Sequence, residues 1–185
     1  MKIKDVIKIT AALLGREDVT LYLSSSGEAK ESTLSAVNLM TTLANLVINE
    51  LAGSYIPILK SEKVFATGGR IYYKNLSENA LKIVRVIGED GCEKDFSYSP
   101  SYITVPNGTY EVEYQYSPCN YGIDETIGYE EKDVPARVLA YGTAAEFCLT
   151  EASFEQAVTW HQRYADGIAK ICLPSNSVIK KRSFI

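Results

Sequence analysis

The chain has 185 residues, of which 46% are hydrophobic and 23% are charged, and its formal net charge is −4. This length allows one well-buried core with a small satellite unit, and the composition is that of an ordinary globular protein. No apolar run approaches the roughly 20 residues of a transmembrane helix, and the acidic balance argues against a sequence-independent nucleic-acid binder. The N-terminus lacks the continuous apolar stretch of a signal peptide, so we expect none.

The first part of the chain predicts helices. Aliphatic residues at helical spacing predict a helix over 2–15 that ends at a glycine, and a short helix or turn over 19–23. A serine–glycine loop at 24–27 follows. A longer helix is predicted over 32–51, and its leucines extend beyond a single face. We therefore expect this helix to be buried on more than one side.

From residue 54 the chain changes to β-branched and aromatic residues with frequent turn signals. Seven strands are predicted, near 55–59, 64–66, 70–73, 81–87, 94–98, 102–105 and 110–116. Turn residues at 89–91 predict one hairpin, and those at 106–108 predict another between the last two strands. Tyrosine and valine alternate with acidic and amide residues over 110–116, which indicates a sheet with one solvated face.

Residues 120–133 are irregular and acidic, and two amphipathic helices follow. The first is predicted over 134–152, with Pro135 in its first turn, where the missing N–H has no cost. The second begins at Ser153, an N-cap with a glutamine three residues later, and ends before Pro174. Its predicted buried stripe consists of Phe154, Ala157, Trp160, His161, Tyr164, Ile168 and Ile171.

This order of elements predicts an α+β fold. Helices from 1–53 and a helical hairpin from 120–174 form an antiparallel bundle, 54–119 form an inserted antiparallel β-subdomain, and 175–185 form an extended basic tail. Residues 120–177 carry nine acidic and four basic side chains, whereas the last eight residues carry three basic and no acidic ones. Such a tail suits head-to-tail contact between subunits or docking on an acidic partner, and a solvated tail is the alternative.

The sequence shows no pattern typical of catalysis or metal binding. We interpret the single histidine, His161, as a core or interface residue, because no nucleophile signature surrounds it or Cys148. The four cysteines lack C-x-x-C spacing and are expected to be reduced and mostly buried. The acidic loop lacks the ligand spacing of a calcium site, and Gly68-Gly69 precede a strand, which indicates a turn. We therefore expect no enzyme activity, no metal and no cofactor.

The chain contains 13 tyrosines, many of them in the β segment. Three interpretations are open: a stacking platform for single-stranded nucleic acid, a subunit interface, or a tyrosine-rich sheet core. A stacking platform needs interleaved basic residues, and 54–119 carry seven basic and eight acidic residues. Aromatic residues are enriched at interfaces, which supports the second interpretation.

The closing helices resemble those of a known family. The run Ala140-Tyr141-Gly142-Thr143-Ala144-Ala145-Glu146-Phe147-Cys148-Leu149, the segments 154–157 and 160–164, and the ending 179–185 resemble parts of bacteriophage head–tail adaptor (connector) proteins of siphoviruses and podoviruses. The overall plan is similar to that of podovirus gatekeeper-type adaptors. The resemblance is specific over about 50 C-terminal residues and architectural over the rest.

The resemblance implies a structural virion protein that forms a ring, commonly of twelve subunits, beneath the portal. The implied partners are the portal protein, neighbouring copies of the chain and a tail or stopper protein, with no membrane. DNA would pass through the channel without sequence-specific binding. The implied location is the virion neck, after assembly in the host cytoplasm. A tail-completion or other neck protein that contacts the tail, and a small-molecule-binding α+β domain, are the alternatives.

Two sets of contact residues follow from this interpretation. The tail residues expected to meet the portal or a neighbouring subunit are Ile179, Lys180, Lys181, Arg182, Phe184 and Ile185. The aromatic residues expected in the helical core or at an interface are Tyr141, Phe147, Phe154, Trp160 and Tyr164. No residue is assigned to catalysis, a metal or a cofactor.

Overall fold

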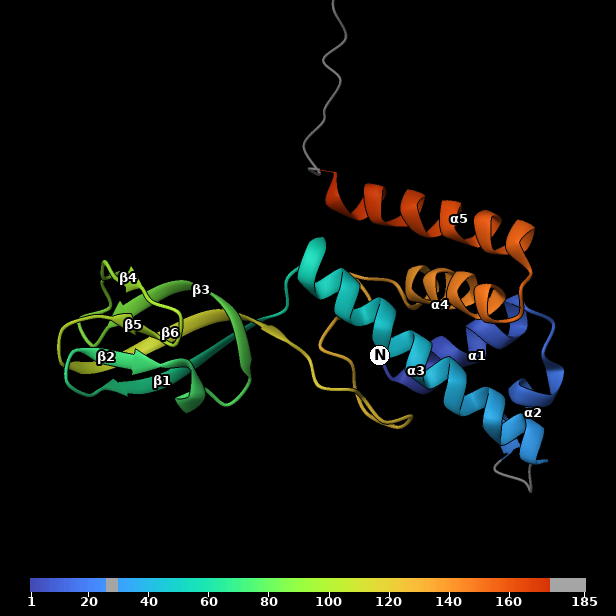
Figure 1. The fold of residues 1–185 in the computed structure, drawn as a ribbon, viewed down its shortest axis with the longest axis horizontal. Coiled ribbons are helices and arrows are strands. Elements are labelled where there is room, and N and C mark those ends of the chain that lie inside the picture. The colour runs from blue at the N-terminus through green and yellow to red at the C-terminus, as the bar shows by residue number, and fades with distance from the viewer. Residues whose placement is uncertain (26–29, 174–185) are drawn as a thin grey trace, which may run out of the picture.

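The structure is a computed structural model that describes residues 1–25 and 30–173. Its elements form a helical unit and a β unit along the long axis of the molecule (Figure 1). The helical unit contains α1 (Ile3–Leu13), α2 (Glu17–Ser25), α3 (Glu31–Ser54), α4 (Ala136–Thr150) and α5 (Phe154–Cys172). The β unit contains β1 (Leu59–Ala66), β2 (Arg70–Tyr72), the 3₁₀ turn η1 (Tyr73–Asn75), β3 (Asn79–Gly88), β4 (Ser97–Tyr98), β5 (Tyr102–Thr104) and β6 (Gly108–Ser117). Helices and antiparallel sheets in separate parts of the chain confirm the predicted α+β class.

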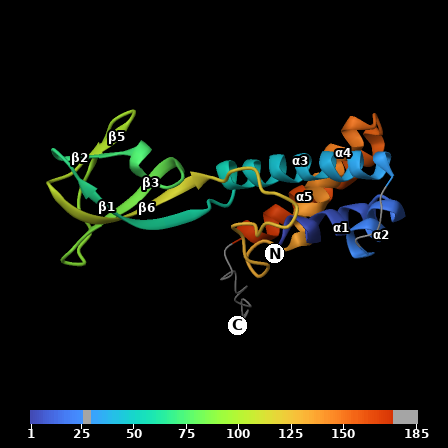
Figure 2. The same cartoon turned by 90° about the horizontal axis from the view of Figure 1, so that it is seen from below.

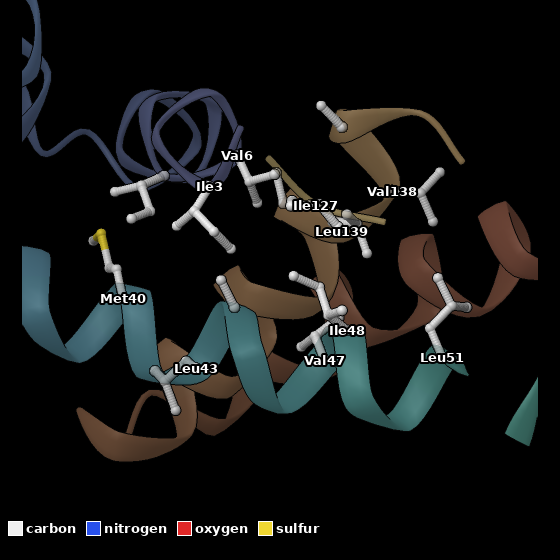
Figure 3. Packing of buried hydrophobic residues seen from close by; sticks show 14 of the residues in the cluster. Ile3, Val6, Met40, Leu43, Val47, Ile48, Leu51, Ile127, Val138 and Leu139 are labelled. Carbon is white, nitrogen blue, oxygen red and sulfur yellow. The ribbon is translucent and has the colours of Figure 1, made fainter. Parts of the chain in front are cut away.

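One hydrophobic cluster, with side chains from all five helices, holds the helical unit together. Ile3 and Val6 of α1, Ile48 of α3 and Leu139 of α4 are fully enclosed. Figure 3 shows side chains of α1 and α3 pointing toward one another, with Ile127 adding to the cluster from the segment before α4. Because each buried aliphatic side chain contributes roughly 1.5–3 kcal/mol, this cluster is the main source of the unit's stability.

Glycines mark one place where a helix ends and one where three helices meet. Gly15 follows α1 with a φ of +68°, so the predicted stop is confirmed. Gly142 of α4 lies where a Cβ would come within 2.8 Å of Val47 Cγ1 in α3 and 3.1 Å of Tyr164 Cδ2 in α5. A residue without a side chain therefore lets α3, α4 and α5 approach closely.

The connection after α3 differs from the prediction. α3 continues to Ser54, and β1 begins only at Leu59. The N–H of Tyr55 still donates to the Leu51 carbonyl at 3.0 Å, as in the last turn of a helix. The predicted strand 55–59 is therefore wrong. Ile56 and Ile58 pack against the helical core, which gives the segment a strand-like composition. Its contact with β6 begins at its end, where the Ile58 carbonyl accepts a hydrogen bond from the Tyr116 N–H.

The β unit consists of two three-stranded antiparallel sheets, with strand orders β1-β6-β3 and β2-β5-β4. Both sheets contribute to a second hydrophobic cluster. Its fully buried side chains are Ala66, Ile71, Ile83, Val86, Ile103, Val112 and Tyr114. The alternation predicted for 110–116 is confirmed, because Tyr110, Val112 and Tyr114 are buried whereas Glu111 is exposed.

Of the two predicted hairpins, the first is confirmed and the second is wrong. The first joins β3 to the residues after it, through an antiparallel bridge between Ile87 and Glu93. The second, at 106–108, does not form, since β5 and β6 belong to different sheets. Asn107 instead accepts a hydrogen bond through Oδ1 from the Gly69 N–H at 2.6 Å. Its side chain thus links two loops of the unit, a long-range role that the turn signal alone does not reveal.

Polar side chains hold the end of β6 and the segment after it against α3. Asn45 of α3 accepts a hydrogen bond from the Tyr121 N–H at 2.8 Å and donates one to the Tyr121 carbonyl at 2.9 Å. Gln115 of β6 donates through Nε2 to the Ala52 carbonyl at 2.8 Å. These bonds fix the β unit at the C-terminal end of α3, where Figure 2 shows it continuing the long axis of that helix.

Candidate interaction surface on the last two helices

α5 is the outermost helix of the helical unit. It packs along α4 (Figure 1), and its buried side chains are Ala157, Tyr164 and Ile168. Because α5 has one main neighbour, most of its remaining side chains are exposed. This exposed surface, together with the grooves beside it, is the candidate interaction surface.

The five predicted aromatic contacts lie in three different environments. Phe147 and Tyr164 are buried in the helical unit. Tyr141 and Trp160 are half-buried and stack between α4 and α5, with ring centroids 5.8 Å apart and planes at 20°. Phe154 is 64% exposed. A core position is therefore excluded for Phe154 in this chain alone, and an interface position stays a prediction.

Two residues assigned to the buried stripe of α5 lie outside it. Phe154 and His161 are exposed, so this part of the prediction is wrong. A helix that packs against one neighbour buries a narrower stripe than its apolar and aromatic residues suggest. Phe154 and Val158, which is 70% exposed, are four residues apart and therefore share one side of the helix. We call this pair the outer face of α5.

A groove of about 610 Å³ lies between the beginning of α4 and the second half of α5, and we call it the α4–α5 groove. The Arg137 guanidinium lies 5.5 Å from the centre of the Tyr141 ring, and that of Arg163 lies 4.8 Å from the Trp160 ring. In the described part of the chain, neither arginine nor the neighbouring Lys170 forms an ion pair. Arginines stacked on aromatic rings keep their N–H edges available to an anion.

The basic residues of the α4–α5 groove were missed by the sequence analysis. The signal that could have found them is an arginine three or four residues from an aromatic residue on the same helix. Both Arg137 with Tyr141 and Trp160 with Arg163 have this spacing. Arg137, Tyr141 and Arg163 meet in one groove because α4 packs on α5, which neither pair reveals by itself.

A second groove, of about 310 Å³, lies between the end of α3 and the second half of α5, and we call it the α3–α5 groove. It is lined by Glu50, Tyr55, His161, Tyr164, Ala165, Ile168, Ala169 and Cys172. The Tyr164 hydroxyl is buried without a hydrogen-bond partner among the described residues, and burial raises its pKa. Glu50 is exposed and forms no ion pair within residues 1–25 and 30–173.

The tyrosines of the β unit contribute to its packing. Tyr110 and Tyr114 are buried, and their hydroxyl groups donate to the Pro106 carbonyl and the Glu62 carboxylate, both at 3.0 Å. A buried tyrosine usually satisfies its hydroxyl in this way. These contacts favour the tyrosine-rich sheet core over a stacking platform.

The prediction that the cysteines are mostly buried is wrong. Cys148 is buried, and burial raises its pKa, but Cys92, Cys119 and Cys172 are exposed. All four are free thiols. Cys172 shows the reason, because it lies in the last turn of α5 and lines the open α3–α5 groove. A helical pattern does not by itself imply burial.

The tail residues expected to contact the portal or a neighbour, 179–185, lie outside the described residues, as does the rest of the predicted extended tail. In the described ranges, no three His, Cys, Asp or Glu side chains gather closely enough to hold a metal ion. None of the helices described combines the length and the apolar character needed to cross a bilayer.

No protein-family model matches the chain, and no curated protein matches it.

Proposed function

We propose that the chain is a structural protein of a phage virion, a head–tail adaptor that forms a ring with copies of itself and joins the portal to the tail. The ring occupies the neck of the virion after assembly in the host cytoplasm, and DNA passes through its channel without sequence-specific binding. The chain has a role in assembly and no catalytic step. The observation that carries the proposal is the outer face of α5.

The outer face supports a protein partner because it consists of two large apolar side chains on a helix that already packs through another side. Phe154 and Val158 are 64% and 70% exposed. Burying such a side chain in an interface is worth roughly 1.5–3 kcal/mol, and aromatic residues are enriched in interfaces. A neighbouring copy and the portal are the partners that the resemblance of these helices implies.

The α4–α5 groove adds charge to the same helix pair. Arg137, Arg163 and Lys170 lie in it with one acidic residue, Asp166, although the protein as a whole has a net charge of −4. A local basic surface on an acidic protein favours an acidic partner surface and gives an association rate that falls with added salt. This surface therefore supports a docking role for α4 and α5.

The shape of the molecule supports a joining role. The β unit extends from one end of the helical unit, so the two units present surfaces far apart on one chain (Figures 1 and 2). An adaptor needs such separated surfaces, because it must contact its neighbours and the portal as well as a tail component.

Native mass spectrometry of the purified chain, alone and mixed with the portal of the same phage, tests the proposal. We expect the wild-type chain to add to the portal as a ring. The variant with both Phe154→Glu and Val158→Glu should keep its helical circular dichroism and lose ring formation. Phe65→Glu is the matched control, because Phe65 of β1 is 62% exposed but lies in the β unit. The control should assemble like the wild type.

If the double variant formed normal rings, the outer face would have no role in ring assembly. Binding to tail components but not to the portal would favour the tail-completion alternative. Binding to neither, with a small molecule retained by the purified chain, would favour a ligand-binding domain.

A further inference from the structure

We propose that the α3–α5 groove is the binding site for residues 175–185 of the same chain. In the free protein these residues would cover the exposed side of α5 next to α3. Binding of this segment in the groove is separate from the adaptor function and does not depend on it. It adds a cover for a surface that is otherwise open to other partners.

The position of the groove suits this segment. The last turn of α3 lies beside the last turns of α5 in both views of the ribbon (Figures 1 and 2). The lining extends along α5 from His161 to Cys172, with Tyr55 on the opposite wall. Cys172 is the final residue of α5, so the chain leaves the helix at the end of its own groove.

The groove contains a polar atom without a partner. The Tyr164 hydroxyl is buried, and no described residue accepts or donates a hydrogen bond to it. Buried hydroxyl groups nearly always have a partner, because leaving one unpaired is unfavourable. The backbone of a bound segment supplies carbonyl and N–H groups at regular spacing, which can satisfy this hydroxyl.

The charge at the groove is complementary to the segment. Glu50 is exposed at the groove and has no ion pair in the described part of the chain. The groove also lies at the C-terminal end of α3, a helix of 24 residues with no basic residue in its last turn. Cations are favoured at such an end by the helix dipole. The segment contains Lys180, Lys181 and Arg182 and no acidic residue.

The apolar walls are complementary to the end of the segment. Ile168, Ala165 and Ala169 line the groove. Phe184 and Ile185 supply apolar side chains directly after the basic run. A segment with both basic and apolar residues thus meets a groove with both a free carboxylate and apolar walls.

The segment is long enough to reach every part of the groove. The last eight residues, 178–185, would span about 26 Å if extended, at about 3.3 Å per residue. The α5 residues of the groove, from His161 to Cys172, span about 17 Å at 1.5 Å per residue. The intervening sequence, Pro174-Ser175-Asn176-Ser177, consists of residues that favour turns. Attachment to the same chain gives an effective concentration in the millimolar range, which favours binding within one molecule.

Thiol labelling tests this inference, because Cys172 lines the groove and Cys92 and Cys119 are exposed elsewhere. The labelling rate of each cysteine by iodoacetamide is measured by peptide mass spectrometry in the full chain and in a chain that ends at Leu173. We expect Cys172 to react about tenfold more slowly in the full chain, the protection given by a Kd of about 0.1 mM at a millimolar effective concentration. Cys92 and Cys119 should react equally in both.

Charge reversal separates binding in the groove from a general effect of the segment on the thiol. Glu50→Lys in the full chain should raise the Cys172 rate to that of the shortened chain. Combining it with Lys180→Glu, Lys181→Glu and Arg182→Glu should restore protection, because the signs are opposite again. A synthetic peptide of residues 175–185 should protect Cys172 of the shortened chain.

Three results would overturn the inference. The first is an equal Cys172 rate in the full and shortened chains. The second is protection that grows with protein concentration, which would identify the segment of a second copy as the occupant. The third is protection that Glu50→Lys leaves unchanged. None of these measurements involves the portal, so they are independent of the test of the adaptor function.

Discussion

Tyr129 and Tyr164 show how the hydrogen bond of a hydroxyl group changes the contribution of a buried tyrosine to stability. Their exposed fractions are 6% and 3%, and burial raises the pKa of both. The Tyr129 hydroxyl donates to the Ile56 carbonyl at 2.6 Å. The Tyr164 hydroxyl has no partner among the described residues. The two side chains are thus buried to a similar extent, but among the described residues the hydroxyl of Tyr129 has a hydrogen-bond partner and that of Tyr164 has none.

Replacing each tyrosine by phenylalanine in a chain that ends at Leu173 tests this difference. Tyr129→Phe should lower the free energy of unfolding by about 1–3 kcal/mol, because the Ile56 carbonyl loses its partner. Tyr164→Phe should change it by less than about 0.5 kcal/mol, since no hydrogen bond is lost. Urea denaturation followed by circular dichroism measures both. Equal losses would show that Tyr164 has a partner within the shortened chain. In the full chain, a loss on Tyr164→Phe is expected if residues 175–185 bind the groove.

At the scale of elements, Asp18 links α2 to α3. Its carboxylate accepts hydrogen bonds from Arg16 at 2.9 and 3.0 Å and from the Thr33 hydroxyl of α3 at 3.0 Å. The Arg16 bonds are the largest reason that the pKa of Asp18 is lowered in the folded protein. The Asp18 side chain is 42% exposed, so solvent screening reduces the contribution to no more than about 1 kcal/mol.

The lowered pKa gives a stability that depends on pH. A carboxyl with a lowered folded pKa stabilises the protein above its unfolded pKa of about 3.9, and this stability is lost as pH falls further. Asp18→Asn should therefore lower the unfolding free energy at pH 7, and the difference from wild type should shrink below about pH 4. Urea titrations across this range measure it. Asp124→Asn, at an exposed carboxylate outside the ion pairs of the described residues, should show little change. A difference for Asp18→Asn that stays constant with pH would contradict the assignment.

At the scale of the whole molecule, two hydrophobic clusters divide the chain into two units. The strand pair that joins them brings the entry and exit of the β unit together. The Tyr116 N–H donates to the Ile58 carbonyl at 3.1 Å, and Lys60 pairs with Tyr114 in the register of β1 and β6. A short turn can therefore replace most of the β unit without moving the ends of the helical unit.

Replacing 61–113 by Asn-Gly, a sequence that suits a two-residue hairpin turn, tests the independence of the helical unit. We expect the shortened protein to keep its helical circular dichroism and a cooperative thermal transition, because the helical cluster is left intact. The test does not require the β unit to fold by itself. Loss of the helical signal would show that the β unit is needed for the helices to fold.

The sequence by itself determined the α+β class, the positions of the four longer helices and the alternation of β6. These follow from local rules: apolar spacing, glycine and proline at ends, and a period of two in a strand with one buried face. Each rule concerns residues close together in the chain. Local patterns therefore predicted the features that depend on residues close together in the chain.

The tertiary structure alone decided which side chains of those elements are covered. Phe154 and His161 are exposed because α5 has one main neighbour, and the arginines of the α4–α5 groove meet because α4 packs on α5. Asn107 bonds to Gly69 rather than closing a hairpin, and 55–58 connect two units rather than forming a strand. Burial and long-range hydrogen bonds depend on elements far apart in the chain, so no local pattern of this sequence contains them.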